Sequence, residues 1–279
     1  MDYRLLALDV DGTLLDSDHR LRPRVAQALR AVASAGFAIT LATGKQFRSI
    51  RPLLDELGVL GPQICLNGAA IVAGEREQPV AYAPLLEDDR REVIAQVRRA
   101  APDVLISQFA LDAIYVDESQ RRHPLLGVFA EYGEQAPMLV SDLPRASLPP
   151  TAKILVAGSP QRMAELRAVV TPALHQRVYI TTTMPEFLEF FAFDANKGTA
   201  LRRLRDDLGI PREGVIAVGD GENDIPLLRE AGLGVAMGNA RPATLAMANH
   251  VIPSNDDDGL AVFLEALLAN PSWPLVCNG

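Results

Sequence analysis

Short, unbroken apolar runs recur in the first and last parts of the chain, with amphipathic segments between them. Leu5–Leu8 is the first run, and similar runs occupy residues 37–42, 63–66, 214–219 and 234–237. Runs of this length, separated by helical patterns such as residues 22–36, are typical of strands buried on both faces of a parallel sheet. Pro23 near the start of that helical pattern and Gly36 after its end fit the preferences of helix termini. The pattern therefore predicts an α/β fold built from βαβ units.

The middle of the chain follows a different pattern. The expected elements are helices at 87–100 and 162–170 and strands at 104–109, 113–117, 153–157, 178–182 and 188–191. Hairpins mixed with helices indicate an α+β module inserted into the parallel-sheet domain. We therefore expect a core domain of residues 1–82 and 191–279 and an inserted domain of residues 83–190.

Composition narrows the class of protein. A chain of 279 residues that is 48% hydrophobic and 22% charged is typical of a globular protein of about two domains. The net charge of -8 argues against binding to nucleic acid, which requires clustered cations. Cys65 and Cys277 give no disulfide framework and indicate a reducing compartment, and no apolar run reaches the ~18 residues of a membrane span. We expect a cytoplasmic protein with no membrane partner.

Polar and glycine-rich turns follow several of the predicted core strands. The residues concerned are Asp9, Asp11, Gly12, Thr43, Gly44, Asn67, Asp220, Asn223 and Asp224, and Lys197 begins a predicted helix. Because the carboxyl ends of parallel strands meet at one edge of a sheet, these turns should share one rim. Taken singly, Asp9–Gly12 is also a common Asx-type turn, and the acidic loop at 220–224 is also a helix N-cap. Four carboxylates crowded at one rim, however, would be costly without a cation, and they imply a metal.

Four ordered motifs resemble those of the haloacid dehalogenase superfamily. They are Asp9-Val10-Asp11-Gly12-Thr13, Thr43-Gly44, Lys197-Gly198 and Gly219-Asp220-Gly221-Glu222-Asn223-Asp224. The insert between Thr43 and Lys197 and the turns at 67–69 and 237–240 are most similar to the Cof-type phosphatases with a type-2 (C2B-like) cap. The resemblance covers essentially the whole chain. It implies a Rossmann-like parallel sheet core with an inserted α+β cap, and a Mg²⁺-dependent phosphatase that acts through an aspartyl-phosphate.

The same resemblance implies a role for each motif. Asp9 is the expected nucleophile, and Asp11 is expected to protonate the leaving group and then activate water. Thr43 and Lys197 would stabilise the charge of the transferring phosphoryl group. The implied Mg²⁺ ligands are Asp9, the backbone carbonyl of Asp11, Asp220 and Asp224. The expected substrate-binding residues are Gly12, Gly44, Asn67 and Asn223.

The sequence leaves the substrate open among sugar phosphates, phosphorylated cofactors and nucleotides. The segments Met184-Pro185-Glu186 and Leu111-Asp112 are our candidates for the part of the cap that faces it. Lys45 occupies a position where many relatives carry Arg, so a role for this side chain in gripping substrate or bracing the cap is in doubt. A phosphomutase, a specialised sugar-phosphate phosphatase and a non-catalytic regulatory binding protein are the alternative functions. A monomer and a homodimer are both compatible with the sequence.

Overall fold

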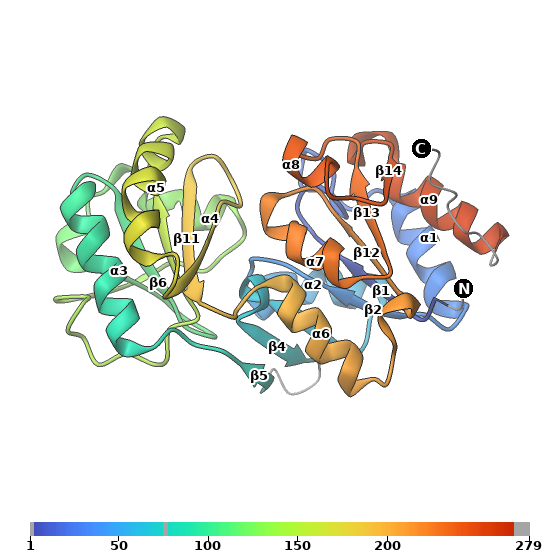
Figure 1. Ribbon diagram of the computed structural model, residues 1–279, viewed down its shortest axis with the longest axis horizontal. Helices are drawn as coiled ribbons and strands as arrows, with labels where there is room; N and C mark the ends of the chain where they lie inside the picture. Colours follow the sequence, from blue (N-terminus) through green and yellow to red (C-terminus); the bar gives the residue numbers. More distant parts are fainter. Residues whose placement is uncertain (1–2, 75–77, 271–279) are drawn as a thin grey trace.

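The strand β1 (Leu5–Leu8) lies between β12 (Val215–Gly219) and β2 (Ala38–Leu41) in a five-stranded parallel sheet. The strand order is β14-β13-β12-β1-β2, where β13 is Leu233–Met237 and β14 is His250–Ile252. This sheet forms one of two lobes of the computed structural model, which describes residues 3–74 and 78–270 (Figure 1). The sheet confirms the α/β fold predicted from the apolar runs.

Helices cover both faces of this sheet, which explains why β1 is apolar at every position. Leu6 and Leu8 pack in one cluster with α1 (Pro23–Ser34), α2 (Phe47–Leu57) and α9 (Gly259–Ala269). Leu5 and Ala7 point to the other face, where they pack with α6 (Lys197–Asp207) and α7 (Ile225–Glu230). The short helix α8 (Pro242–Leu245) lies beside β13. No helix among the described residues is long and apolar enough to cross a membrane.

The third predicted core strand, β3 (Pro62–Cys65), contacts the parallel sheet through a single bridge between Ala42 and Ile64. It continues instead in a three-stranded antiparallel sheet with β4 (Ala70–Ala73) and β5 (Gln78–Tyr82), which the sequence pattern did not predict. The turn after β3 still reaches the expected rim, because the backbone N–H of Asn67 donates to the carbonyl of Thr43 at 2.8 Å.

The second lobe is a six-stranded sheet with the order β10-β11-β9-β6-β7-β8 (Figure 1). Its strands are β6 (Leu105–Phe109), β7 (Ile114–Asp117), β8 (Met138–Val140), β9 (Lys153–Ala157), β10 (Val178–Thr181) and β11 (Phe187–Ala192). Its helices are α3 (Glu87–Ala100), α4 (Val128–Glu131) and α5 (Pro160–Leu174). This lobe confirms the inserted α+β module. The exact boundaries of the two domains remain predictions.

The two faces of the cap sheet have different neighbours. Ile154 and Val156 of β9 face α3 and α5, and they pack there with Leu188 and Phe190 of β11. The alternate positions, which include Leu155 and Phe187, face the first lobe, as the two-residue period of a strand requires. This face of the cap sheet, part of which is covered by Phe129 of α4, is therefore turned toward the rim that carries the sequence motifs.

Short 3₁₀ helices occupy many of the connections. They are Leu66–Gly68, Glu118–Gln120, Pro124–Gly127, Arg212–Gly214, Glu222–Asp224 and Asn255–Asp257. Two of them, Leu66–Gly68 and Glu222–Asp224, carry Asn67 and Asn223, so the tight turns place these amides at the carboxyl ends of β3 and β12.

Candidate active site

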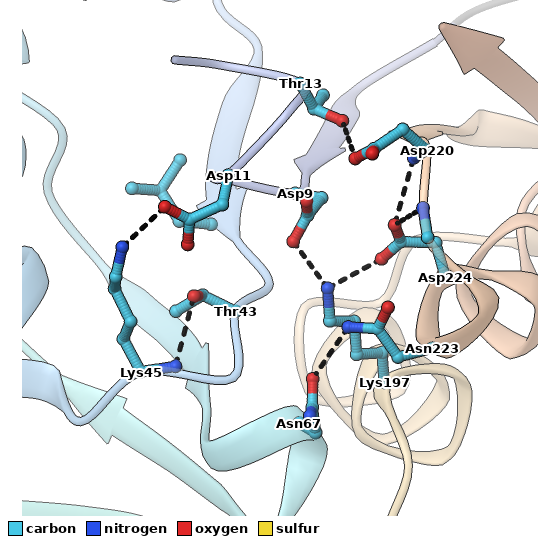
Figure 2. A network of polar contacts seen from close by, with 12 residues as sticks. Asp9, Asp11, Thr13, Thr43, Lys45, Asn67, Lys197, Asp220, Asn223 and Asp224 are labelled. Carbon is cyan, nitrogen blue, oxygen red and sulfur yellow. Dashed lines mark hydrogen bonds and ion pairs between the residues drawn. The ribbon is translucent and has the colours of Figure 1, made fainter. Parts of the chain in front are cut away.

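The ammonium group of Lys197 joins two carboxylates at the centre of the rim (Figure 2). Its Nζ lies 2.5 Å from Asp9 Oδ1 and 2.6 Å from Asp224 Oδ1, and the three side chains are buried. Burial alone would lower the pKa of Lys197, but the charges of Asp224 and Asp9 outweigh it and raise that pKa. Lys197 is therefore a fixed cation that holds Asp9 at the end of β1.

The N-terminal cap and first turn of α6 determine the position of Lys197. Asn196 caps the helix by accepting a hydrogen bond from the backbone N–H of Thr199 at 3.0 Å, and Thr199 Oγ1 accepts from the backbone N–H of Asn196 at 3.2 Å. A Cβ atom on Gly198 would lie 2.4 Å from the carbonyl oxygen of Pro226. Glycine at this position thus lets α6 approach α7 closely enough for Lys197 to reach between Asp9 and Asp224.

The acidic loop after β12 is held in place by its own backbone. Asp224 Oδ2 accepts hydrogen bonds from the backbone N–H groups of Asp220, at 3.0 Å, and Gly221, at 2.8 Å. Thr13 donates its hydroxyl to Asp220 Oδ1 at 3.0 Å. Gly12 has a φ of +81°, and a Cβ atom there would lie 2.6 Å from Asp220 Oδ2. Only glycine allows the first loop to turn this close to Asp220.

Asp9, Asp220 and Asp224 form a group of potential metal ligands. Each contributes one carboxylate oxygen, and these three oxygens all lie within 4.8 Å of one another. Burial raises the pKa of Asp9 well above its usual value, and the nearby charge of Asp224 raises it further. Burial and Asp224 also raise the pKa of Asp220, to about 7. A divalent cation would relieve this repulsion, and an all-oxygen donor set suits Mg²⁺, so the residues fit the metal expected from the sequence.

Asp11 has a separate set of partners. Its Oδ1 lies 2.5 Å from Lys45 Nζ and 3.4 Å from His19 Nδ1, and its side chain is directed toward Lys45 in Figure 2. The Asp11 carboxylate does not belong to the group formed by Asp9, Asp220 and Asp224. The buried hydroxyl of Thr43 accepts a hydrogen bond from the backbone N–H of Lys45 at 3.1 Å. Lys45 thus connects the second motif to the first.

A chain of side-chain hydrogen bonds links the core to the cap. Asn223 donates to Asn67 Oδ1 at 3.0 Å, and Asn67 donates to Glu189 Oε2 of the cap at 2.9 Å. Lys153, also in the cap, lies 2.5 Å from Glu189 Oε1 and donates to the carbonyl of Gly44 at 2.9 Å. The Nζ atom of Lys153 also lies over the ring of Phe109, 4.5 Å from the ring centroid. These hydrogen bonds place a buried ion pair of the cap directly against the rim that carries the sequence motifs.

A cavity of about 450 Å³ lies between the core rim and the cap. Of the predicted site residues, those that line it are Asp9, Asp11, Gly12, Gly44, Asp220 and Asn223. The other predicted residues, Thr43, Asn67, Lys197 and Asp224, are buried and do not line it. The motifs therefore divide into a layer that faces the cavity and a layer that supports it.

The cap segments proposed to face the substrate have different outcomes. Met184 lines the cavity, as expected, whereas Pro185 and Glu186 of the same segment do not. Leu111 and Asp112 do not line it: Leu111 packs against the hydrophobic core, and the Asp112 carbonyl accepts a hydrogen bond from Gln135 Nε2 at 2.5 Å. The expectation for this hairpin turn was wrong, because the turn is bound to the loop that follows α4.

Sequence reasoning missed Lys153 and Glu189. Each is a charged residue inside a buried apolar strand, and that position was the available signal. Reasoning about Lys45 considered only substrate and cap, so its ion pair with Asp11 was also missed. Asn239, in the turn at 237–240, donates to the carbonyl of Gly12 at 2.8 Å and so supports the first loop, a contact that the sequence did not indicate.

A model of the haloacid dehalogenase-like hydrolases matches residues 6–264. The chain therefore belongs to the haloacid dehalogenase-like hydrolases, the family suggested by its four motifs. Within that family it is a phosphatase, the activity by which its relatives are named.

Two relatives illustrate the likeness. An HMP-PP phosphatase from Enterobacter sp. (strain 638) is 30% identical over 97% of this chain and 98% of its own length. The 5-amino-6-(5-phospho-D-ribitylamino)uracil phosphatase YitU from Bacillus subtilis (strain 168) is 25% identical over 94% of this chain and 96% of its own length. Among solved structures, a haloacid dehalogenase-like hydrolase from Bacteroides thetaiotaomicron covers 95% of this chain and 100% of its own, with a TM-score of 0.82 and 27% identity.

Proposed function

We propose that this protein is a Mg²⁺-dependent phosphatase that hydrolyses small phosphorylated metabolites through an aspartyl-phosphate on Asp9. The observation that carries the proposal is the arrangement around Asp9. Its carboxylate follows a buried strand, lines the cavity, contacts the Lys197 ammonium, and lies close to the carboxylates of Asp220 and Asp224. Burial next to one fixed cation gives Asp9 a defined position from which to attack phosphorus.

Asp9, Asp220 and Asp224 are the side chains that would hold Mg²⁺, together with the backbone carbonyl of Asp11. The bound ion would supply neutralisation of the negative charge that the phosphate brings beside these carboxylates.

Asp9 attacks phosphorus in the first step, and the bond from phosphorus to the leaving oxygen breaks. Asp11, carrying the proton that it takes up in the second step of each cycle, gives this proton to that oxygen, so an alcohol departs. In the second step Asp11 takes a proton from water, the resulting hydroxide attacks phosphorus, and the bond to Asp9 breaks to release phosphate. Asp11 lines the same cavity as Asp9, and Lys45 fixes its position.

The buried layer supports these groups. Lys197 orients Asp9 and places a positive charge where the phosphoryl group transfers, and Thr43 contributes its hydroxyl dipole to the same region. Gly12, Gly44 and Asn223 are proposed to contact the substrate, because they line the cavity. Both polar groups of the Asn67 amide are engaged by Asn223 and Glu189, so we propose that Asn67 positions Asn223.

Small phosphorylated metabolites are the proposed substrates because the cap forms one wall of the cavity and because relatives are named for such compounds. The cap, proposed as residues 83–190, excludes water during the first step. We place the enzyme in the cytoplasm, since its two cysteines indicate a reducing compartment. Whether it is a monomer or a homodimer remains a prediction.

The test is phosphate release from a panel of phosphorylated metabolites, with Mg²⁺ and with a chelator. We expect metal-dependent release by the wild type and a loss of more than ~10³-fold for Asp9→Asn, whose amide cannot attack phosphorus. Asp18→Asn is the matched control, because Asp18 is an exposed carboxylate on the same loop. Release by Asp9→Asn at a rate close to wild type would refute the proposal. Transfer of phosphate within a sugar phosphate without release would identify a phosphomutase.

A further inference from the structure

The wall that the cap contributes to the cavity is largely apolar and aromatic. It is made by Phe109, Phe129, Tyr132, Leu155, Met184 and Phe187. The opposite wall carries the carboxylates of Asp9, Asp11 and Asp220. A ligand that fills the cavity therefore meets carboxylates at the core and mainly apolar side chains, together with Glu134, Lys153, Thr183 and Glu189, at the cap.

Tyr132 links these two walls. Its ring packs edge-on against Phe187 of the cap, with the ring centroids 5.1 Å apart at 68°. The Tyr132 ring also packs edge-on against the ring of His19, with the ring centroids 6.3 Å apart and an interplanar angle of 83°. His19 Nδ1 in turn lies 3.4 Å from Asp11 Oδ1. Tyr132 is only partly buried, whereas Phe187 is 6% exposed. Tyr132 thus offers ring surface to the cavity next to the catalytic loop.

The charged groups of the cap wall are already occupied. Lys153 and Glu189 bind each other and the core groups Gly44 and Asn67. Glu134 accepts hydrogen bonds from Ser49 Oγ at 2.8 Å and from the backbone N–H of Gln46 at 3.2 Å. A leaving group with many hydroxyls would lose water on entering this cavity and regain few hydrogen bonds from these groups, which disfavours its binding.

We propose that the site selects phosphate monoesters whose leaving alcohol carries a flat aromatic or heteroaromatic ring, and that Tyr132 is a specificity-determining residue that contacts this ring. The inference rests on the proposed phosphatase function of the same site. Aromatic rings prefer edge-to-face and offset contacts with one another, and Tyr132 and Phe187 already form such a pair at the wall. A polyol phosphate gains no comparable contact.

Kinetics test the proposal with three esters: pyridoxine 5′-phosphate, which has a heteroaromatic ring and no reactive aldehyde, glucose 6-phosphate and glycerol 3-phosphate. We expect kcat/KM for the ring ester to exceed both others by at least ~tenfold, the scale of a single aromatic contact. Tyr132→Ala should reduce this preference by about tenfold, mainly through KM, and Tyr132→Phe should keep it. Phe193→Ala is the matched control, because Phe193 is 55% exposed and lies outside the cavity. The proposal would be overturned if the wild type had the same kcat/KM for all three esters. It would also be overturned if Tyr132→Ala lowered kcat/KM for all three by the same factor.

A binding measurement separates this inference from the proposed function. Calorimetry with Mg²⁺-loaded Asp9→Asn should give a dissociation constant for pyridoxine 5′-phosphate at least ~tenfold below that for glucose 6-phosphate, and Tyr132→Ala in the same background should remove the difference. Similar or reversed affinities would refute the ring preference. If no ester releases phosphate, the proposed function fails, and the affinities still decide the specificity.

Discussion

The ammonium of Lys45 lies 2.5 Å from the carboxylate of Asp11, and both side chains are largely shielded from solvent. The two residues belong to different loops, one after β1 and one after β2. Their ion pair therefore fixes the position of the proposed acid and base relative to Thr43, two residues before Lys45. Lysine is sufficient here because the contact needs a single charge and no bidentate fork.

Replacement of Lys45 should impair turnover more than binding. We expect Lys45→Met to lower kcat by roughly tenfold, about 1.4 kcal/mol, with a smaller change in KM, because Asp11 loses the group that orients it. Arg20→Met removes an exposed cation from the neighbouring loop and serves as the control. Steady-state phosphate release measures both, and an unchanged kcat for Lys45→Met would contradict a positioning role.

Loss of Lys197 should affect both stability and activity. Lys197→Met would leave Asp9 and Asp224 buried without their cation, and we expect unfolding to become easier by about 3–5 kcal/mol. Separately, kcat/KM should fall by a factor that corresponds to ~3–4 kcal/mol of lost transition-state stabilisation. Urea unfolding and phosphate release, compared with Arg203→Met on the exposed side of α6, measure the two effects. Wild-type stability in Lys197→Met would show that the carboxylates do not depend on this cation.

The ion pair between Lys153 and Glu189 should behave as a unit. Glu189→Gln alone leaves the Lys153 charge buried without its counter-charge, and we expect a loss of roughly 3 kcal/mol. Adding Lys153→Met should restore most of this loss, since the amide introduced at position 189 still accepts from Asn67 and no buried charge remains. A double-mutant cycle in urea measures the coupling. Additive effects of the two substitutions would argue against a coupled pair.

Asp117 should make the stability of the cap depend on pH in the acidic range. Burial would raise the pKa of Asp117, but hydrogen bonds from Ser119, from the backbone of Leu143 and from Arg98 lower it from the ordinary 3.8 to about 2. A carboxyl group whose folded pKa is lowered stabilises the fold above its unfolded pKa and loses that contribution as the pH falls toward its folded pKa. The stability difference between wild type and Asp117→Asn should therefore shrink by about 1 kcal/mol between pH 5 and pH 3. Urea unfolding at several pH values measures it, and a constant difference would contradict the assignment.

The parallel core could be predicted from sequence because each of its strands is an apolar run and its polar residues come immediately afterwards. Asp9 and Asp220 are found this way, since the ends of β1 and β12 determine where they lie. β4 is an apolar run of four residues, as long as β1, and was overlooked, whereas β5 contains Pro79 and follows a charged segment. Their pairing with β3 depends on tertiary contacts that local preference does not encode.

The contacts between loops were the least predictable part of the site. Lys45 and Asp11 are 34 residues apart, and Asn67 and Glu189 are 122 residues apart. Spacing gives the face on which a strand residue lies, but it does not give the partner across the boundary between two lobes. Lys153 and Glu189 could have been noticed as charges in buried strands, yet their roles require knowing that this face of the cap meets Gly44 and Asn67.

The pairing of Leu5 with Val215 has a consequence for biosynthesis. β1 and β2 leave the ribosome first, but β12, the other neighbour of β1, is synthesised only in the last quarter of the chain. The six-stranded cap sheet is a continuous segment and is complete by Ala192, so it can fold while β1 still has an open edge. The nascent protein thus carries an unfinished, apolar sheet beside a finished cap, and this interval is the stage of synthesis at which chaperones have most to protect.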